Sequence, residues 1–418
     1  YWLGWKVEGQ PRGKSGWMWT GVLINGLSLF SLKALSSPYG ASLLHTLGWQ
    51  TDWTAVLLPV GFSFYVLQNI SYLVDVSRRQ LPASRDLADF ALYLVYFPKL
   101  LAGPIERARI FLPKLANPRR VDNTTIARSF SLIATGLVRK IVIADNLGTL
   151  MPPTIFSASA DFTTTEHLLW LAVFAFKLYN DFAGYTSIVR GVSSLMGIEL
   201  SANFQQPFFA RSFSEFWNRW HISLSHWLRD YIFFPSSRWL IRRRHSSTDL
   251  LALALPPLIT MLVSGYWHGA VASMVAWGGL HGIYQVGERL FPARTLPPEA
   301  GKGQKTFRAV LSALVVFILT TLAWVPFATA GFKQAVQFWG ELLPPFTGGV
   351  SLNSWGWALI FIGISLGMDI YQYRANDEAV FATWPRRAQV WGLALTIIAI
   401  LLSVGTGAQL SGFVYQGF

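Results

Sequence analysis

Long apolar stretches, separated by short polar and basic segments, dominate the chain. They run for roughly 15–22 residues without the alternation of apolar and polar positions that a strand of a membrane barrel needs. Inside hydrocarbon every backbone N–H and C=O needs a partner within the protein, so such stretches predict helices. The expected segments are 17–35, 53–75, 88–103, 129–150, 166–189, 250–266, 271–287, 308–329, 354–372 and 388–404. The predicted fold class is all-α, a polytopic bundle of membrane helices.

Three segments depart from a plain spanning helix. Segment 88–103 is short and contains Pro98 and Gly103, so we expect it to enter the membrane and return. Segment 213–235 mixes tryptophans with charged residues, which suits a helix at the headgroup boundary or along a cavity. The polar insert 291–307 is predicted to be a loop. Because no internal repeat is visible, we expect a single integral-membrane domain over 1–418. The chain begins with Tyr1 rather than Met, so an N-terminal segment is expected to be missing.

Composition and charge support a membrane protein. Only 13% of the residues are charged and 52% are hydrophobic, whereas soluble domains carry about a quarter charged residues. The net charge of +13 gathers in short segments between apolar runs, which is the pattern of cytoplasmic loops and argues against nucleic acid as a partner. Some of this charge could also attract an anionic donor. The basic clusters are Arg78, Arg79 and Arg85; Arg107, Arg109, Lys114, Arg119 and Arg120; Arg238, Arg242, Arg243 and Arg244; Arg289, Arg294, Lys302, Lys305 and Arg308; and Arg374, Arg386 and Arg387.

The residue types present exclude several chemistries. The chain has no cysteine, so a thiol nucleophile, thiolate zinc and any disulfide are excluded. The spacing of the histidines matches no local metal motif, and His221 and His226 lack the glutamate of a HExxH site. No metal is therefore expected.

His268 is the leading candidate for chemistry within the membrane. About fourteen apolar residues precede the predicted turn at Ser264–Ala270. At roughly 1.5 Å per residue they rise about 21 Å, which is less than the ~30 Å of hydrocarbon. His268 is therefore expected within the bilayer, where a neutral imidazole can accept a proton from a hydroxyl group. The alternative is a core histidine that hydrogen-bonds two helices.

Other ionisable groups are expected at similar depth. His221 could orient a donor, stabilise an oxyanion or bridge helices, and His281 has the same alternatives. Asp181 has a functional interpretation as a residue of the tunnel. Its structural interpretation, which we favour, is an anchor bonded to backbone or to an arginine across the bundle.

Five stretches of the chain form a pattern in a fixed order: 58–75, 96–111, 178–208, 215–235 and 264–284. Together they resemble the membrane-bound O-acyltransferases, in particular the bacterial branch that acylates alginate and teichoic acid. The resemblance implies helices around a tunnel, with a thioester donor reaching it from the cytoplasm and an acceptor hydroxyl from outside. It implies that His268 and His221 are the catalytic histidines. The tunnel would then be lined by Trp267, Asn218, Trp220, Ser225, Asp181 and His281.

The resulting hypothesis is a bacterial enzyme with several spans in the cytoplasmic membrane. His268 would be the general base that helps an acceptor hydroxyl attack an acyl thioester, with acetyl as the first candidate group. Acetyl-CoA or an acyl carrier protein would be the cosubstrate, and no cofactor would be tightly bound. The expected partners are membrane lipid, the donor on the cytoplasmic face and extracytoplasmic glycan-modifying proteins. The alternatives are D-alanyl transfer from a carrier protein, and a transporter with a histidine proton relay.

Overall fold

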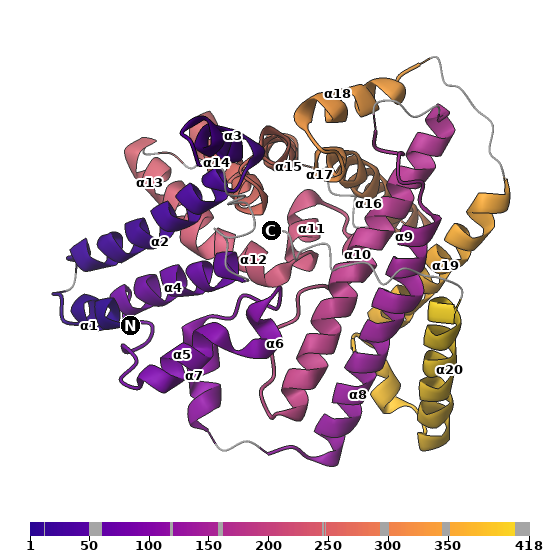
Figure 1. The fold of residues 1–418 in the computed structure, drawn as a ribbon, viewed down its shortest axis with the longest axis horizontal. Coiled ribbons are helices and arrows are strands. Elements are labelled where there is room, and N and C mark those ends of the chain that lie inside the picture. Colours follow the sequence, from indigo (N-terminus) through magenta and orange to yellow (C-terminus); the bar gives the residue numbers. More distant parts are fainter. Residues whose placement is uncertain are drawn as a thin grey trace. The chain divides into compact units, whose positions relative to one another are not determined.

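The computed structural model describes residues 1–11, 13–49, 61–117, 120–157, 162–244, 246, 248–292, 301–344 and 352–405. Within these ranges the chain forms helices and no strand, so the all-α prediction is confirmed. The residues form two compact units, whose boundaries fall within α8 (Asn123–Leu137) and α10 (Thr164–Leu195). The prediction of a single domain stays a prediction. Figure 1 shows the helices in chain order.

Unit 1 comprises 1–129 and 189–201 within the described ranges. Its helices are α1 (Trp2–Glu8), α2 (Gly16–Leu35), α3 (Pro38–Thr46), α4 (Phe62–Ser77), α5 (Leu87–Val95), α6 (Phe97–Leu100) and α7 (Ala108–Ala116). Lys99 of α6 lies at its centre, fully buried, and donates to Gln68 Oε1 and to the backbone oxygen of Tyr93. Its ammonium also lies 5.1 Å from the centre of the Phe111 ring, so one buried cation links α4, α5, α6 and α7.

Unit 2 comprises 130–188 and 202–405 within the described ranges. After the end of α8 it contains η1 (Val138–Asp145, a π-helix), α9 (Asn146–Leu150), most of α10, η2 (Pro207–Phe209), α11 (Phe213–Arg219), α12 (Ile222–Leu228), η3 (Arg229–Phe233), α13 (Phe234–Arg244), α14 (Leu250–His268), α15 (Ala272–Leu290), α16 (Lys302–Ala323), α17 (Val325–Ala328), α18 (Phe332–Glu341), α19 (Leu352–Ala375), η4 (Val380–Thr383) and α20 (Arg386–Gly405).

Four stretches of helix in the described ranges are long and apolar enough to cross a membrane: 16–35, 250–268, 303–328 and 386–405. On α2, α16 and α20 many large apolar side chains are exposed, as on a surface that lipid covers. The exposed residues of α20 include Leu395, Ile397, Ile398, Leu401 and Leu402. The other predicted spans are helical where the structure describes them, but they are shorter, more charged or interrupted. Their crossing of the membrane stays a prediction. The first eight positions of 53–75 lie outside the described residues, as do Arg119 and Arg294.

The structure departs from the predicted pattern at three places. Segment 88–103 divides at Tyr96 into α5 and α6, and its entry into and return from the membrane stays a prediction. The loop prediction for 291–307 is wrong for 302–307, where α16 already runs, because Lys302, Gln304 and Lys305 are good helix formers that extend an apolar helix into water. Helix α14 continues through His268, so the turn begins at Gly269 rather than at Ser264.

Helices α14 and α15 pack side by side as an antiparallel pair in unit 2 (Figure 1). Gly265 and Gly278 allow the backbones of α14 and α15 to approach closely. A Cβ on Gly265 would overlap with the carbonyl oxygen of Met274, and a Cβ on Gly278 with that of Met261. Small residues permit this close approach, as in other membrane helix pairs. The pairing positions His268, at the end of α14, beside the first turns of α15.

Candidate functional site

Three histidines from three separate segments meet in one buried aromatic cluster of unit 2. His268 is the last residue of α14, His281 lies in the middle of α15, and His221 precedes α12. Each has at most 3% of its surface exposed. They are far apart in sequence, and tertiary packing brings them together. We call this set the histidine cluster, and it includes the aromatic rings that join its members.

Tryptophan rings connect the three histidines. The Trp267 ring lies 6.3 Å from His221 and 4.8 Å from His268, measured between ring centres. The Trp277 ring lies 5.0 Å from His268 and 4.9 Å from His281. All four ring pairs meet edge to face or nearly so, the arrangement that aromatic rings favour. Because Trp277 and His281 are four residues apart, they share one face of α15.

Further aromatic rings close the cluster. Trp217 of α11 packs edge-on against His281 at 5.0 Å. Phe182 of α10 meets His221 at 4.8 Å, and Phe327 of α17 meets His268 at 5.6 Å. Side chains of α10, α11, α14, α15 and α17 therefore fix the ring orientations. Packing on all sides limits rotation of the imidazoles and keeps bulk water out.

His221 has an unusual backbone conformation, with φ at +43°. A left-handed conformation at a residue other than glycine costs about 1–3 kcal/mol and is retained only where the surroundings enforce it. Two backbone bonds do so here: Gln205 N donates to Arg219 O at 3.0 Å, and Ile222 N donates to Asn203 O at 2.9 Å. The single interfacial helix suggested for 213–235 is therefore broken at His221, between α11 and α12.

The environment of His221 keeps its ring neutral. Burial lowers the pKa of His221 to about 3, because a charged imidazolium would lose its hydration. At neutral pH the ring therefore carries one N–H donor and one acceptor nitrogen. Such a ring can orient or polarise a substrate group without holding a charge.

Several buried polar atoms in the cluster lack a hydrogen-bond partner among the described residues. They are the indole nitrogens of Trp217 and Trp277, both ring nitrogens of His281 and the hydroxyl of Ser264, one turn before His268. Each such atom costs about 1–3 kcal/mol if nothing bonds to it. Since native proteins leave few buried polar groups unsatisfied, several in one place indicate a site built for a polar ligand.

A cavity of about 150 Å³ lies next to the histidine cluster in unit 2. Trp217 forms part of its wall, and the same indole ring packs against His281 at 5.0 Å. Asn218 and Ser225, two of the predicted tunnel residues, also line it, together with the cations Arg229 and Arg289. His268 is not part of the wall.

The remaining predicted site residues have other surroundings. Trp220 is buried in the aromatic core, where it stacks on Phe216 at 5.6 Å. Asp181 pairs with Lys140 of η1 at 2.7 Å. A cation therefore anchors this carboxylate, as the structural interpretation expected, but the cation is a lysine and not an arginine. The same ammonium lies 2.8 Å from Asp145. A role of Asp181 in the tunnel stays a prediction.

Sequence reasoning missed Trp217, Trp277 and Phe327, although these rings hold the histidines together. Only Trp277 left a usable signal, because its spacing of four from His281 puts both on one helical face. Among the residues that the structure describes, no group of three or more His, Asp or Glu side chains could hold a metal ion.

Comparisons with known proteins agree on one family. The family model for membrane-bound O-acyltransferases matches residues 27–323, which include the histidine cluster except Phe327. Probable alginate O-acetylase AlgI of Pseudomonas fluorescens is 32% identical over 345 residues, or 82% of this chain. The peptidoglycan O-acetyltransferase of Helicobacter pylori is 27% identical over 396 residues, which cover 87% of this chain and 69% of the relative. A teichoic acid D-alanyltransferase of Streptococcus thermophilus is 30% identical over 229 residues, 54% of this chain and 55% of the relative. The chain spans 64% of the length of the Pseudomonas fluorescens relative.

Proposed function

Because the chain belongs to the membrane-bound O-acyltransferase family, we propose that it transfers an acyl group from a thioester to a hydroxyl of an extracytoplasmic polysaccharide or envelope polymer. Acetyl is the first candidate group, since two of the relatives are named for O-acetyl transfer. The observation that supports the proposal most is the histidine cluster itself. It combines a candidate base with buried donors, the indole nitrogens of Trp217 and Trp277, that have no acceptor among the described residues.

In the proposed mechanism His268 is the general base. Its ring accepts the proton of the acceptor hydroxyl as that oxygen attacks the thioester carbonyl, a step that general-base catalysis speeds by roughly 10²–10⁴-fold. The C–O bond forms and the C–S bond breaks. The imidazolium then returns the proton to the leaving thiolate, so the histidine ends as it began.

The negative charge that develops on the carbonyl oxygen needs donors. Trp277 Nε1–H and Trp217 Nε1–H are suited to this, because both are buried and have no acceptor within the described residues. The neutral ring of His221 could supply a third donor. The sequence suggested His221 for this role, so the indoles of Trp217 and Trp277 are additions.

The donor would reach the cluster through the cavity beside Trp217. Arg229 and Arg289 line this cavity, and the next helix, α13, ends in the basic residues Arg242, Arg243 and Arg244. Positive charge of this kind suits the phosphates of acetyl-CoA or the acidic surface of a carrier protein. We place this side in the cytoplasm of a bacterium, with the chain crossing the cytoplasmic membrane several times and no cofactor tightly bound. Glycan-modifying proteins outside the membrane are expected partners.

The test is complementation of a strain that lacks the gene. Wild type and His268→Gln are expressed at equal levels, and ester-linked acyl groups released by mild base from envelope glycans are measured by mass spectrometry. We expect His268→Gln to lose at least about 99% of the product, the lower limit for a lost general base. Acetate and D-alanine differ in mass, so the same measurement distinguishes the acyl groups.

His167→Gln is the matched control. His167 is also a buried histidine of unit 2, but it packs on Phe338 and its Nδ1 contacts Thr163 O at 3.2 Å, outside the cluster. We expect this variant to retain activity. Full activity of His268→Gln, or equal losses in both variants, would remove the proposed role of His268.

A further inference from the structure

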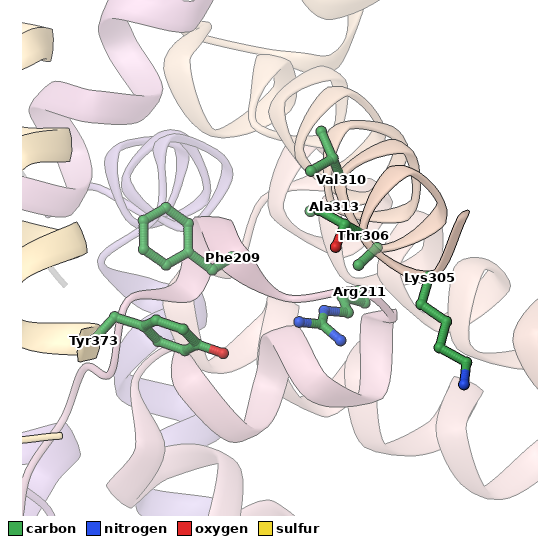
Figure 2. A pocket seen from close by; sticks show the side chains of 8 residues that line it. Phe209, Arg211, Lys305, Thr306, Val310, Ala313 and Tyr373 are labelled. Atoms are coloured by element: carbon green, nitrogen blue, oxygen red, sulfur yellow. The ribbon is translucent and has the colours of Figure 1, made fainter. Parts of the chain in front are cut away.

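A second and larger cavity of unit 2 lies at the cytoplasmic end predicted for α16, away from the histidine cluster. Its volume is about 640 Å³. Phe209 of η2 and Arg211 form one side, Lys305, Val310 and Ala313 of α16 form another, and Tyr373 of α19 forms a third. We call it the α16 groove (Figure 2).

Helix α16 gives the groove a charged end and an apolar end. The lining positions 305, 306, 309, 310 and 313 follow the three- and four-residue spacing of one helical face. From Lys305 to Ala313 the helix rises about 12 Å at roughly 1.5 Å per residue, the distance from a lipid headgroup into the acyl region. Beyond Arg308 no charged residue follows until Lys333, and 303–328 is long and apolar enough to cross a membrane.

The charged end is cationic. Arg211 and Lys305 are both exposed there, and Figure 2 shows their charged groups with the Tyr373 hydroxyl along one edge of the groove. In the same view Phe209, Val310 and Ala313 lie on the opposite side. Glu215, the carboxylate bonded to the Arg211 backbone at 2.8 Å, is already paired with Arg219 at 2.7 Å. Arg211 and Lys305 therefore both line the groove as exposed cations.

The apolar end continues into a lipid-exposed surface. Leu311, Leu314 and Ile318 of α16 are each about half exposed, as expected of side chains in contact with acyl chains. Ala309 and Ala313 are small, so they leave a channel along the helix between larger neighbours. A free sugar phosphate or nucleotide would leave this channel unfilled, whereas an acyl chain would fill it.

We propose that the α16 groove binds one anionic glycerophospholipid. Its phosphate lies between Arg211 and Lys305, and one acyl chain runs along Ala309, Val310 and Ala313 toward the bilayer. The charge of the groove complements the headgroup, and basic pockets at the cytoplasmic ends of membrane helices are suited to such lipids. The proposal does not depend on acyl transfer by the histidine cluster.

The test measures lipid binding by native mass spectrometry. The full chain, purified in a neutral detergent and stripped of lipid, is titrated with phosphatidylglycerol or with phosphatidylcholine. We expect the first phosphatidylglycerol to bind more tightly than phosphatidylcholine. Near a membrane surface each cation contributes about fivefold in affinity, so Arg211→Gln/Lys305→Gln should weaken phosphatidylglycerol binding about 25-fold.

Two further variants separate the contributions of charge and channel. Arg386→Gln/Arg387→Gln removes the same charge from an exposed site at the start of α20 and should change the affinity less than about twofold. Ala313→Trp fills the channel without changing charge and should also weaken binding. An excess of inorganic phosphate should not displace the lipid, because it cannot occupy the apolar end.

Equal affinity of wild type and Arg211→Gln/Lys305→Gln would overturn the proposal. So would an equal loss in the α20 control pair, because the effect would then come from net charge alone. Displacement by inorganic phosphate together with unchanged binding by Ala313→Trp would show a free-anion site in place of a lipid site.

Discussion

Replacing Trp277 with phenylalanine removes one N–H group from the histidine cluster while retaining an aromatic ring. The Trp277 ring lies 4.9 Å from His281, 5.0 Å from His268 and 5.8 Å from Trp217. A phenyl ring preserves much of this packing, so the smaller volume should cost about 1–3 kcal/mol of unfolding free energy. If the indole N–H stabilises the oxyanion, its loss should lower kcat by about 10²–10³-fold.

Trp324→Phe is the control for this substitution. Trp324 is equally buried and lies 5.5 Å from Trp277, but its indole nitrogen is not among the buried atoms without a partner. The change in ring size is the same, so its cost in stability should be similar while kcat falls less than about tenfold. The assay is acyl transfer by the purified chain in lipid nanodiscs, with a radiolabelled thioester and an acceptor glycan at saturation. Equal values of kcat for the two variants would refute an oxyanion role for Trp277.

Two other predictions concern stability, measured as thermal unfolding followed by tryptophan fluorescence. The folded pKa of His221 is about 3 and its ordinary value is 6.5, so only the unfolded chain takes up this proton as the pH falls below 6.5. Lowering the pH from 7.5 to 5.0 should therefore reduce the unfolding free energy of wild type by about 2 kcal/mol through this group. The same loss should be absent in His221→Asn, a variant chosen because asparagine tolerates the left-handed backbone. Identical pH dependence of the two proteins would contradict the assignment. Gly265→Ala should lower the unfolding free energy of the protein by about 1–3 kcal/mol, because the new Cβ would overlap with the carbonyl oxygen of Met274. A Cβ at Gly363 of α19 meets no atom within 4 Å, so Gly363→Ala should be neutral or stabilising. Equal unfolding temperatures for the two alanine variants would show that close packing of α14 on α15 is not needed.

The sequence by itself determined the helical class and the approximate extent of most helices. An apolar run is a local property of the sequence. Inside lipid its backbone N–H and C=O groups must be paired within the protein, and a helix is the structure that pairs them within one such run. Boundaries were less determined, because helix propensity continues past the end of an apolar run. That is why 302–307 are helical, and why α14 reaches His268, past the predicted end of its segment at 266.

The candidate histidines were visible in the sequence, but their assembly was not. His221, His268 and His281 lie in three segments whose relative position depends on the packing of α14 on α15 and on the rings between them. The left-handed backbone at His221 likewise depends on two backbone hydrogen bonds, one that Ile222 donates to Asn203 and one that Gln205 donates to Arg219.

Only the tertiary structure decided which polar groups have partners. It paired Asp181 with Lys140 and left the indole nitrogen of Trp277 without an acceptor among the described residues. A sequence shows that a residue can donate or accept a hydrogen bond. Whether a partner lies within reach depends on distances between segments remote along the chain, and these exist only after folding.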